Sequence, residues 1–382
     1  MTDPRLSKLA EVLVNYSVKV QPGDWVIITG NVIAEPLINE VLANVLKAGG
    51  NPTTFINSDT LAETNYLHSS EEQLQWISPT EKMLFEDADV LISLQAAENT
   101  RALNAIDPQK QQTRARARSG IMETYMKRSA EGTFRWTLTN YPCAAYAQEA
   151  DMSLRDYEDF IYQATFTDQE YPVKEWQRIH DEQQRLVDWL KGKKAVSVKS
   201  PNADLTLSID GRTFINSDGT HNMPSGEIFT GPVEDSANGW VKFTYPAITA
   251  GREVEGVHLE FKDGKVVKAT STNTEHLNKV LDTDEGSRYV GEFSLGFHPR
   301  ITAPMKDILF DEKIAGSIHL TPGQAYDEAW NGNKSQIHWD LILRMDPEAG
   351  GGEVWFDDKL IRKDGQFVLD ELLGLNPDQL VA

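Results

Sequence analysis

Two histidines and an aspartate near the C-terminal end of the chain are spaced as metal ligands on short strands. Residues 335–343 predict a β-strand, and His338 and Asp340 then share one face because side chains alternate between faces. Residues 317–320 predict a second strand, with His319 opposite its apolar residues. Imidazole and carboxylate groups that converge from neighbouring strands can bind a divalent metal ion. A lone histidine beside apolar residues is more often an ordinary core or surface residue than a metal ligand. The hypothesis of a metal site therefore depends on the two histidines and the aspartate together.

Two glutamates in the same half of the chain have settings unlike those of ordinary surface charges. Glu227 lies in PSGEIFTGP, between glycine and proline turn signals. Glu292 lies in the apolar run YVGEFSLGF, where a charged side chain needs a partner. Each has an ordinary alternative, a turn cap for Glu227 and the solvent face of a strand for Glu292. With the histidines and the aspartate they make five candidate ligands, which exceeds one tetrahedral zinc ion and fits two metal ions sharing a carboxylate or water.

Length and composition limit the class of protein. A chain of 382 residues predicts two or three domains with sizeable cores. The formal net charge of −21 disfavours nucleic acids and anionic membranes as partners, because both are negatively charged. Cys143 is the one cysteine, which excludes an intramolecular disulfide and a cysteine-based zinc site. We expect a cytoplasmic protein, since no signal sequence and no apolar run of about 18 residues is present.

Strands and helices alternate in the first half of the chain. Apolar runs predict strands at 24–29, 53–56, 88–94 and 133–138, and helical periodicity predicts helices at 4–14, 35–48 and 108–128. This alternation is typical of βαβ units, so we expect an α/β domain with a mostly parallel sheet. The residues after the first strand, Gly30-Asn31-Val32, lack the G-x-G-x-x-G pattern, which gives a dinucleotide site little support.

Short alternating strands dominate after a long predicted helix at 171–191. The dipeptide Asp263-Gly264 predicts a tight hairpin, and residues 353–362 predict a second hairpin near the end of the chain. The change of pattern predicts two domains. Residues 1–192 form the α/β N-terminal domain, and residues 193–382 form a β-rich, largely antiparallel, metal-binding catalytic domain.

The order Glu, Glu, His, Tyr, His-x-Asp, set in GEIFTGP, DEGSRYVGE, IHLTPGQAY and NKSQIHWD, resembles the M29 family of metalloaminopeptidases of the aminopeptidase T type. The resemblance covers nearly the whole chain and includes PCAAYAQEADMS at 142–153, where Cys143 is an uncommon residue. It implies a homodimer whose α/β domain precedes a β-rich domain with two divalent metal ions. The implied metal ligands are Glu227, Glu292, His319, His338 and Asp340, and the implied catalytic tyrosine is Tyr326.

The resemblance implies hydrolysis of N-terminal residues from peptides by a metal-activated water. Two divalent ions roughly 3.5–4 Å apart lower the pKa of a water that they share. Glu292 is expected to be the bridging ligand and the general base, two roles that conflict if metal ions bind both of its oxygens. The turn expected at residues 321–323 returns Tyr326 toward the metal ions, where its phenol can stabilise the oxyanion. A free α-amino group can bind one of the ions.

Two alternatives remain beside the dinuclear hydrolase. Proteins of similar fold, the 2,5-dihydroxypyridine dioxygenases, use one iron(II) ion with two histidines and a carboxylate. Those relatives lack a glutamate that matches Glu292, and this chain has both Glu292 and Glu227. A binding protein with a structural metal is disfavoured, because structural zinc sites usually include cysteines. The ligand set accommodates zinc, cobalt, manganese or magnesium, so the metal stays open.

Overall fold

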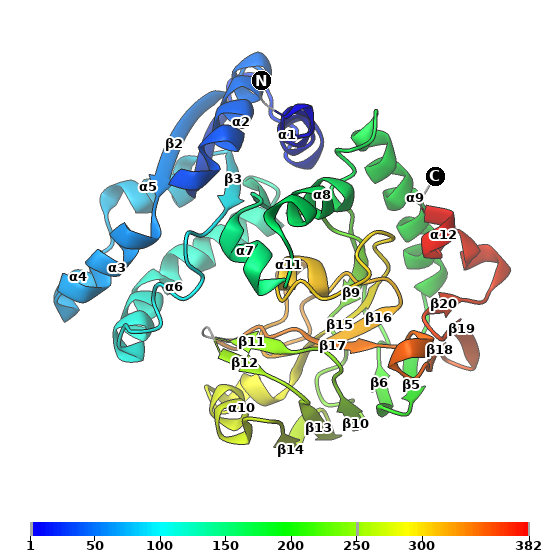
Figure 1. The fold of residues 1–382 in the computed structure, drawn as a ribbon. Coiled ribbons are helices and arrows are strands. Elements are labelled where there is room, and N and C mark those ends of the chain that lie inside the picture. The colour runs from blue at the N-terminus through cyan, green and yellow to red at the C-terminus, as the bar shows by residue number, and fades with distance from the viewer. Residues whose placement is uncertain (1–2, 250–251, 381–382) are drawn as a thin grey trace. The chain divides into compact units, whose positions relative to one another are not determined.

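The chain folds into two compact units. The computed structural model describes residues 3–249 and 252–380 (Figure 1). The first unit takes in the chain up to Lys174 together with Gly219–Pro224, and the second takes in Glu175–Asp218 and the chain from Ser225 on. The helix before residue 192 therefore belongs to the second unit from Glu175 on, and the short segment Gly219–Pro224 belongs to the first unit. As domain limits, residues 1–192 and 193–382 remain a prediction.

A parallel sheet forms the centre of the first unit. Its strand order is β2-β1-β3-β4-β8, and every pair of neighbours is parallel. The strands are β1 (Trp25–Asn31), β2 (Asn51–Asn57), β3 (Val90–Gln95), β4 (Arg135–Asn140) and β8 (Asn222–Met223). The predicted α/β class with a mostly parallel sheet is confirmed, with strand ends displaced by a few residues.

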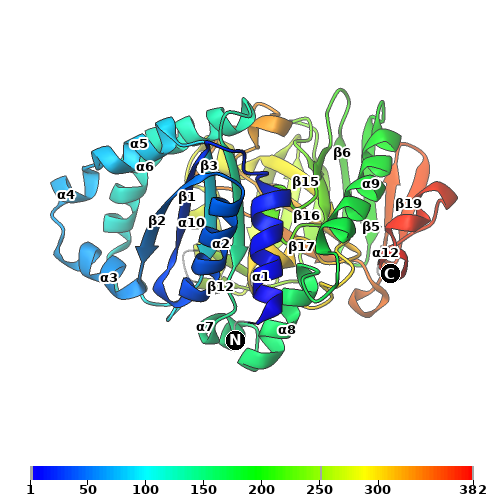
Figure 2. The same ribbon diagram turned by 90° about the horizontal axis from the view of Figure 1, so that it is seen from above.

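Helices connect the strands of this sheet. They are α1 (Pro4–Glu11), η1 (Val12–Ser17), η2 (Val32–Ala34), α2 (Glu35–Lys47), α3 (Asp59–His68), α4 (Glu71–Gln75), α5 (Pro79–Asp87), α6 (Pro108–Ala130), α7 (Ala144–Glu149) and α8 (Leu154–Ala164). Asp3 caps α1 by accepting a hydrogen bond from the Arg5 amide, and Pro4 suits the first helical turn. Helices α1 and α2 lie side by side (Figure 2). None of the helices in the described ranges is long and apolar enough to cross a membrane.

Antiparallel sheets form most of the second unit. One has eight strands in the order β14-β13-β10-β6-β5-β18-β19-β20, another has five in the order β17-β16-β15-β9-β7, and β11 pairs with β12. The strands are β5 (Ala195–Ser200), β6 (Ala203–Ser208), β7 (Ile215–Ser217), β9 (Glu227–Thr230), β10 (Asn238–Lys242), β11 (Ala247–Thr249), β12 (Arg252–Val254), β13 (His258–Lys262), β14 (Lys265–Thr270), β15 (Val290–Gly296), β16 (Ser317–Pro322), β17 (Leu341–Arg344), β18 (Glu353–Phe356), β19 (Lys359–Lys363) and β20 (Gln366–Phe367). Both predicted hairpins, β13–β14 and β18–β19, are confirmed.

Few helices accompany these sheets. They are α9 (Pro172–Leu190), α10 (Thr274–Leu281), η3 (Glu285–Arg288), α11 (Ile308–Asp311), η4 (Asp327–Ala329), η5 (Pro347–Ala349), η6 (Asp370–Leu375) and α12 (Pro377–Leu380). The helical spacing of Trp176, Ile179, Leu186 and Trp189 on α9 predicts a core face; the first three are buried, and Trp189 is half-buried. The predicted β-rich, largely antiparallel second part is confirmed.

Candidate metal centre

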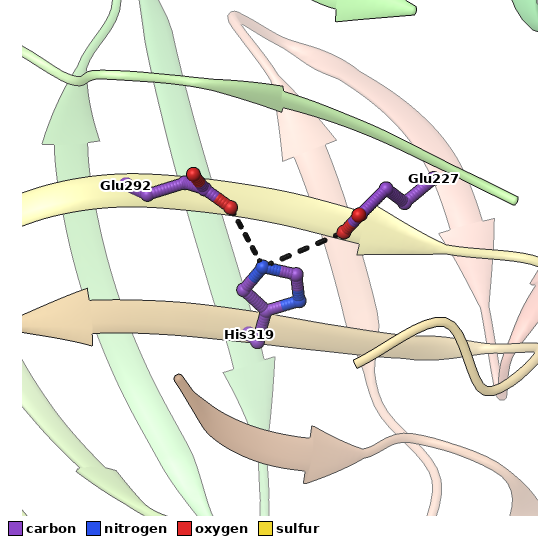
Figure 3. Close-up of side chains that lie close together, drawn as sticks. All are labelled: Glu227, Glu292 and His319. Carbon is purple, nitrogen blue, oxygen red and sulfur yellow. Dashed lines mark hydrogen bonds and ion pairs between the residues drawn. The ribbon is translucent and has the colours of Figure 1, made fainter. Parts of the chain in front are cut away.

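Three neighbouring strands of the five-stranded sheet bring Glu227, Glu292 and His319 together. Strand β15 lies between β9 and β16, and the register places Glu227 opposite Gly296 and His319 opposite Ser294. The His319 Nε2 atom lies 2.9 Å from Glu292 Oε1 and 3.6 Å from Glu227 Oε2 (Figure 3). All three side chains are buried. Their ligand atoms lie within 4.8 Å of one another, which is close enough to share one metal ion.

A second group of possible ligands consists of Glu292, His338 and Asp340. The His338 Nε2 atom lies 3.3 Å from Asp340 Oδ1, and the ligand atoms of this group also lie within 4.8 Å of one another. Asp340 is buried, whereas the His338 side chain is 24% exposed. The structure thus brings the five predicted ligands into one cluster, and Glu292 belongs to both groups. The exposure of His338 marks the side from which solvent reaches the cluster.

The predicted strand at residues 335–343 is wrong from residue 335 to residue 340. Strand β17 begins at Leu341, and before it only His338 forms an isolated bridge, to Gly323. The preceding loop is held by side chains, because Asn333 donates hydrogen bonds to the carbonyl oxygens of Gly286, Tyr289 and Gly323. Main-chain hydrogen bonds from Gln324 to Ile337 and from Trp339 to Pro322 also hold this loop, without forming a continuous strand.

Hydrogen bonds from the surrounding chain orient the candidate ligands. The Nδ1 atoms of His319 and His338 lie 3.2 and 2.8 Å from the carbonyl oxygens of Glu312 and Gln324. When each Nδ1–H donates to its carbonyl, Nε2 is left with its lone pair toward the cluster. Thr321 Oγ1 also donates to Asp340 Oδ1. The two imidazoles are therefore preset as Nε2 ligands.

Burial and mutual attraction shift the pKa values of this cluster. Burial opposes a charge on His319, but the hydrogen bond with Glu292 and nearby carboxylates outweigh it and raise the His319 pKa to about 10. Burial also opposes a charge on His338, while Asp340 raises the His338 pKa to about 10. Burial raises the pKa of Glu292. Without a metal ion the histidines therefore hold protons, and metal binding would release them.

The position of Tyr326 follows from the turn after β16. Pro322 ends the strand, Gly323 has a φ of 108°, and Tyr326 precedes η4. The Tyr326 ring lies beside the His338 ring, with centroids 4.7 Å apart. Burial, followed by the surrounding carboxylates, raises the pKa of Tyr326 well above its usual value. The phenol is thus kept protonated next to a candidate ligand.

Sequence reasoning missed the dipeptide Glu312-Lys313. Both side chains are buried, and the Lys313 ammonium contacts the Glu312 carboxylate. Burial raises the pKa of Glu312 to about 8. Two adjacent charged residues in a loop usually face solvent, so the sequence DEKIAG gives no signal of this burial.

The residues present fit a divalent metal centre. Four buried carboxylates, those of Glu227, Glu292, Glu312 and Asp340, lie in or beside the cluster with one buried ammonium, that of Lys313. With neutral histidines this leaves a surplus of negative charge that bound cations would offset. Among the described residues, the buried Glu292 Oε2 atom has no hydrogen-bond partner. An oxygen without a partner in the carboxylate that both ligand groups share suits metal binding.

Comparison with known proteins identifies the family. A family model described as thermophilic metalloprotease (M29) matches residues 2–367. The chain belongs to the M29 family. Aminopeptidase 2 of Geobacillus stearothermophilus is 29% identical over 351 residues, covering 85% of this chain and 84% of the relative. Aminopeptidase T of Thermus thermophilus is 26% identical over 377 residues, covering 88% and 92%.

Solved structures support the fold. Wild-type AmpT from Thermus thermophilus superposes with a TM-score of 0.81 at 23% identity, over 96% of this chain and 99% of that chain. A 2,5-dihydroxypyridine dioxygenase from Pseudomonas putida superposes with a TM-score of 0.57 at 15% identity, over 96% and 98%. The predicted family and enzyme class, a metallo-aminopeptidase among the M29 hydrolases, are confirmed by the family model and the named relatives.

Proposed function

We propose that this M29 enzyme hydrolyses N-terminal residues from peptides with a water activated by two divalent metal ions. The observation that carries the proposal is the position of Glu292, which belongs to two groups of possible ligands at once. Glu227 and His319 complete one group, and His338 and Asp340 complete the other. A carboxylate shared by two ligand groups suits a bridging ligand of two ions.

The chain's own residues have distinct roles in this proposal. The metal ions supply Lewis acidity and an activated water when bound. Glu292 belongs to both groups and is the proposed bridging ligand; as general base it would need one oxygen free of metal to accept the proton of the attacking water. Tyr326, beside His338 at the exposed side of the cluster, donates a hydrogen bond to the oxyanion that develops on the scissile carbonyl. Thr321 and the carbonyl oxygens of Glu312 and Gln324 hold the ligands in place.

The proposed substrates are peptides with a free N-terminus. A neutral α-amine can bind one metal ion, which would place the first peptide bond at the activated water. The proposal includes a homodimer, as the resemblance to the aminopeptidase T type implies, and the cytoplasmic location expected from the sequence. Zinc, cobalt, manganese and magnesium each suit the nitrogen and oxygen ligands.

Metal counting and a blocked substrate test this function. Elemental analysis and anomalous diffraction of the loaded protein should give two ions per chain at the five side chains. A leucyl-arylamide or an unblocked peptide should be cleaved, and the N-acetylated peptide should stay intact. A single iron(II) ion bound only by His338, His319 and Asp340, with oxygen-dependent ring cleavage, would favour the dioxygenase alternative. Equal cleavage of blocked and unblocked peptides would contradict the role of the free amine.

A further inference from the structure

Lys313 is a fully buried lysine beside the candidate metal centre. It lies in the loop between α11 and β16, and its exposed fraction is 0%. Its ammonium contacts the Glu312 carboxylate and lies 3.6 Å from Glu227 Oε1. A buried charge is costly unless it is paired. These two carboxylates therefore account for the buried ammonium, and one of them is a candidate metal ligand.

The two carboxylate oxygens of Glu227 have different neighbours. Oε2 accepts a hydrogen bond from Ser294 Oγ at 2.9 Å and lies 3.6 Å from His319 Nε2. Oε1 is the oxygen nearer Lys313. Carboxylates bind metal ions through one oxygen or through both. With the ammonium at Oε1, Oε2 is the oxygen turned toward the other candidate ligands (Figure 3).

The same dipeptide also orients the neighbouring histidine. The Glu312 carbonyl oxygen lies 3.2 Å from His319 Nδ1 and orients the His319 ring. The next residue, Lys313, contacts Glu227 through its side chain. The loop approaches β15 closely at Gly296, where a Cβ atom would lie 2.9 Å from the Glu312 carbonyl oxygen. This close approach holds the main chain of the loop, from which the Lys313 side chain extends, against the sheet that carries the candidate ligands.

We propose that Lys313 is a positioning residue of the metal centre, whose ammonium holds Glu227 Oε1 so that Glu227 binds its metal ion through Oε2 alone. The inference rests on the proposed function, because it takes Glu227 as a metal ligand. Partners that orient ligands typically change metal affinity 10- to 100-fold when they are removed. Lys313 is thus expected to set the affinity and the coordination number of the ion at Glu227 and His319.

The first test uses the unaltered protein. A crystal structure of the zinc-loaded full chain should show one Glu227 oxygen on the metal ion and the other on the Lys313 ammonium. Both Glu227 oxygens on the ion would overturn the role of Lys313 and leave the dinuclear proposal standing. A zinc-loaded structure without Glu227 on any ion would instead contradict the proposed ligand set. The two failures are therefore distinguishable.

The second test removes the ion pair as a unit. The double variant Glu312→Gln/Lys313→Met replaces both partners with uncharged side chains of similar size, so neither is left as an unpaired buried charge. We expect affinity for the ion at Glu227, measured by cobalt(II) competition with a chelator, to fall about 10- to 100-fold. The visible absorption of the bound cobalt(II) should also change, because Glu227 can then bind through both oxygens. Wild-type affinity with a wild-type spectrum would reduce the pair to a structural role.

A matched control separates this effect from general loss of an ion pair. Lys268 and Glu260 form an exposed pair at 2.6 Å between β14 and β13. The double variant Glu260→Gln/Lys268→Met should keep the cobalt(II) affinity and spectrum of the wild type. If the buried double variant does not fold, the zinc-loaded wild-type structure still decides the proposal.

Discussion

In the proposed centre, single residues divide into five candidate metal ligands and a tyrosine that is proposed to act on the substrate. The five candidate ligands could be predicted from residue type and motif, because carboxylates and imidazoles are common ligands of divalent metal ions. Lys313 could not be predicted, since its role depends on burial and on the distance to Glu227. Residue type therefore predicts the candidate ligands, whereas the groups that orient them can be recognised only in the folded structure.

At this scale the clearest prediction concerns Tyr326. Tyr326→Phe removes a hydrogen bond made mainly in the transition state, so kcat should fall on the order of 10²–10³, or about 3–4 kcal/mol. KM and metal content should change little. His338→Ala is the contrast, because it removes a ligand: metal occupancy itself should fall, with partial recovery in excess metal. The measurements are turnover of a leucyl-arylamide and metal counts on both variants. A Tyr326→Phe variant with near wild-type kcat would leave the oxyanion to the metal ions alone.

Elements with their own sequence signals were predicted, and elements held by side chains were not. The strand around His319 and the hairpin at Asp263-Gly264 follow from alternation and turn chemistry, and both are present. The segment at 335–340 alternates in the same way, yet it is a loop until Leu341. Its backbone is positioned by Asn333 and by Asp284, which accepts hydrogen bonds from Ser335 Oγ and the Gln336 amide. Such long-range polar contacts leave no periodic pattern in a sequence.

The loop before β17 gives a prediction at the scale of the element. Asn333 is buried and donates to three carbonyl oxygens, so Asn333→Ala removes a donor from each; those of Gly286 and Tyr289 keep a main-chain donor. The free energy of unfolding should fall by roughly 2–3 kcal/mol. Metal binding at His338 and Asp340 should weaken more than binding at His319, because the loop before β17 carries the first two residues and β16 carries His319. Denaturant unfolding and metal titration measure these two effects.

The exposed Asn57 at the end of β2 supplies the matched control for this loop. Asn57→Ala should change the free energy of unfolding by no more than about 0.5 kcal/mol and should leave metal binding unchanged. An Asn333→Ala variant as stable as Asn57→Ala, with normal metal binding, would mean that the loop is held by other contacts.

For the whole molecule, the candidate metal ligands belong to one unit. The parallel sheet of the first unit and the antiparallel sheets of the second follow from the change in pattern along the sequence, because helix and strand periodicities differ. The return of β8 to the first sheet could not be predicted in this way, because a strand of two residues has no periodicity. The five candidate ligands all lie in the second unit, on β9, β15, β16 and the segment before β17.

Metal removal should therefore act unequally on the two units. Without metal ions, protons on His319 and His338 must offset the buried carboxylates, and the candidate ligands no longer share a bound ion. A ligand that binds only the folded state stabilises it by about 4 kcal/mol at a free concentration 1,000-fold above its dissociation constant, and chelation removes this contribution. Hydrogen exchange should accelerate in β9, β15 and β16 of the apo protein and stay unchanged in β1, β3 and β4. Re-addition of metal is the control and should restore protection. Equal loss of protection in both parallel and antiparallel sheets, or no loss in either, would mean that the buried carboxylates do not depend on bound metal for their stability.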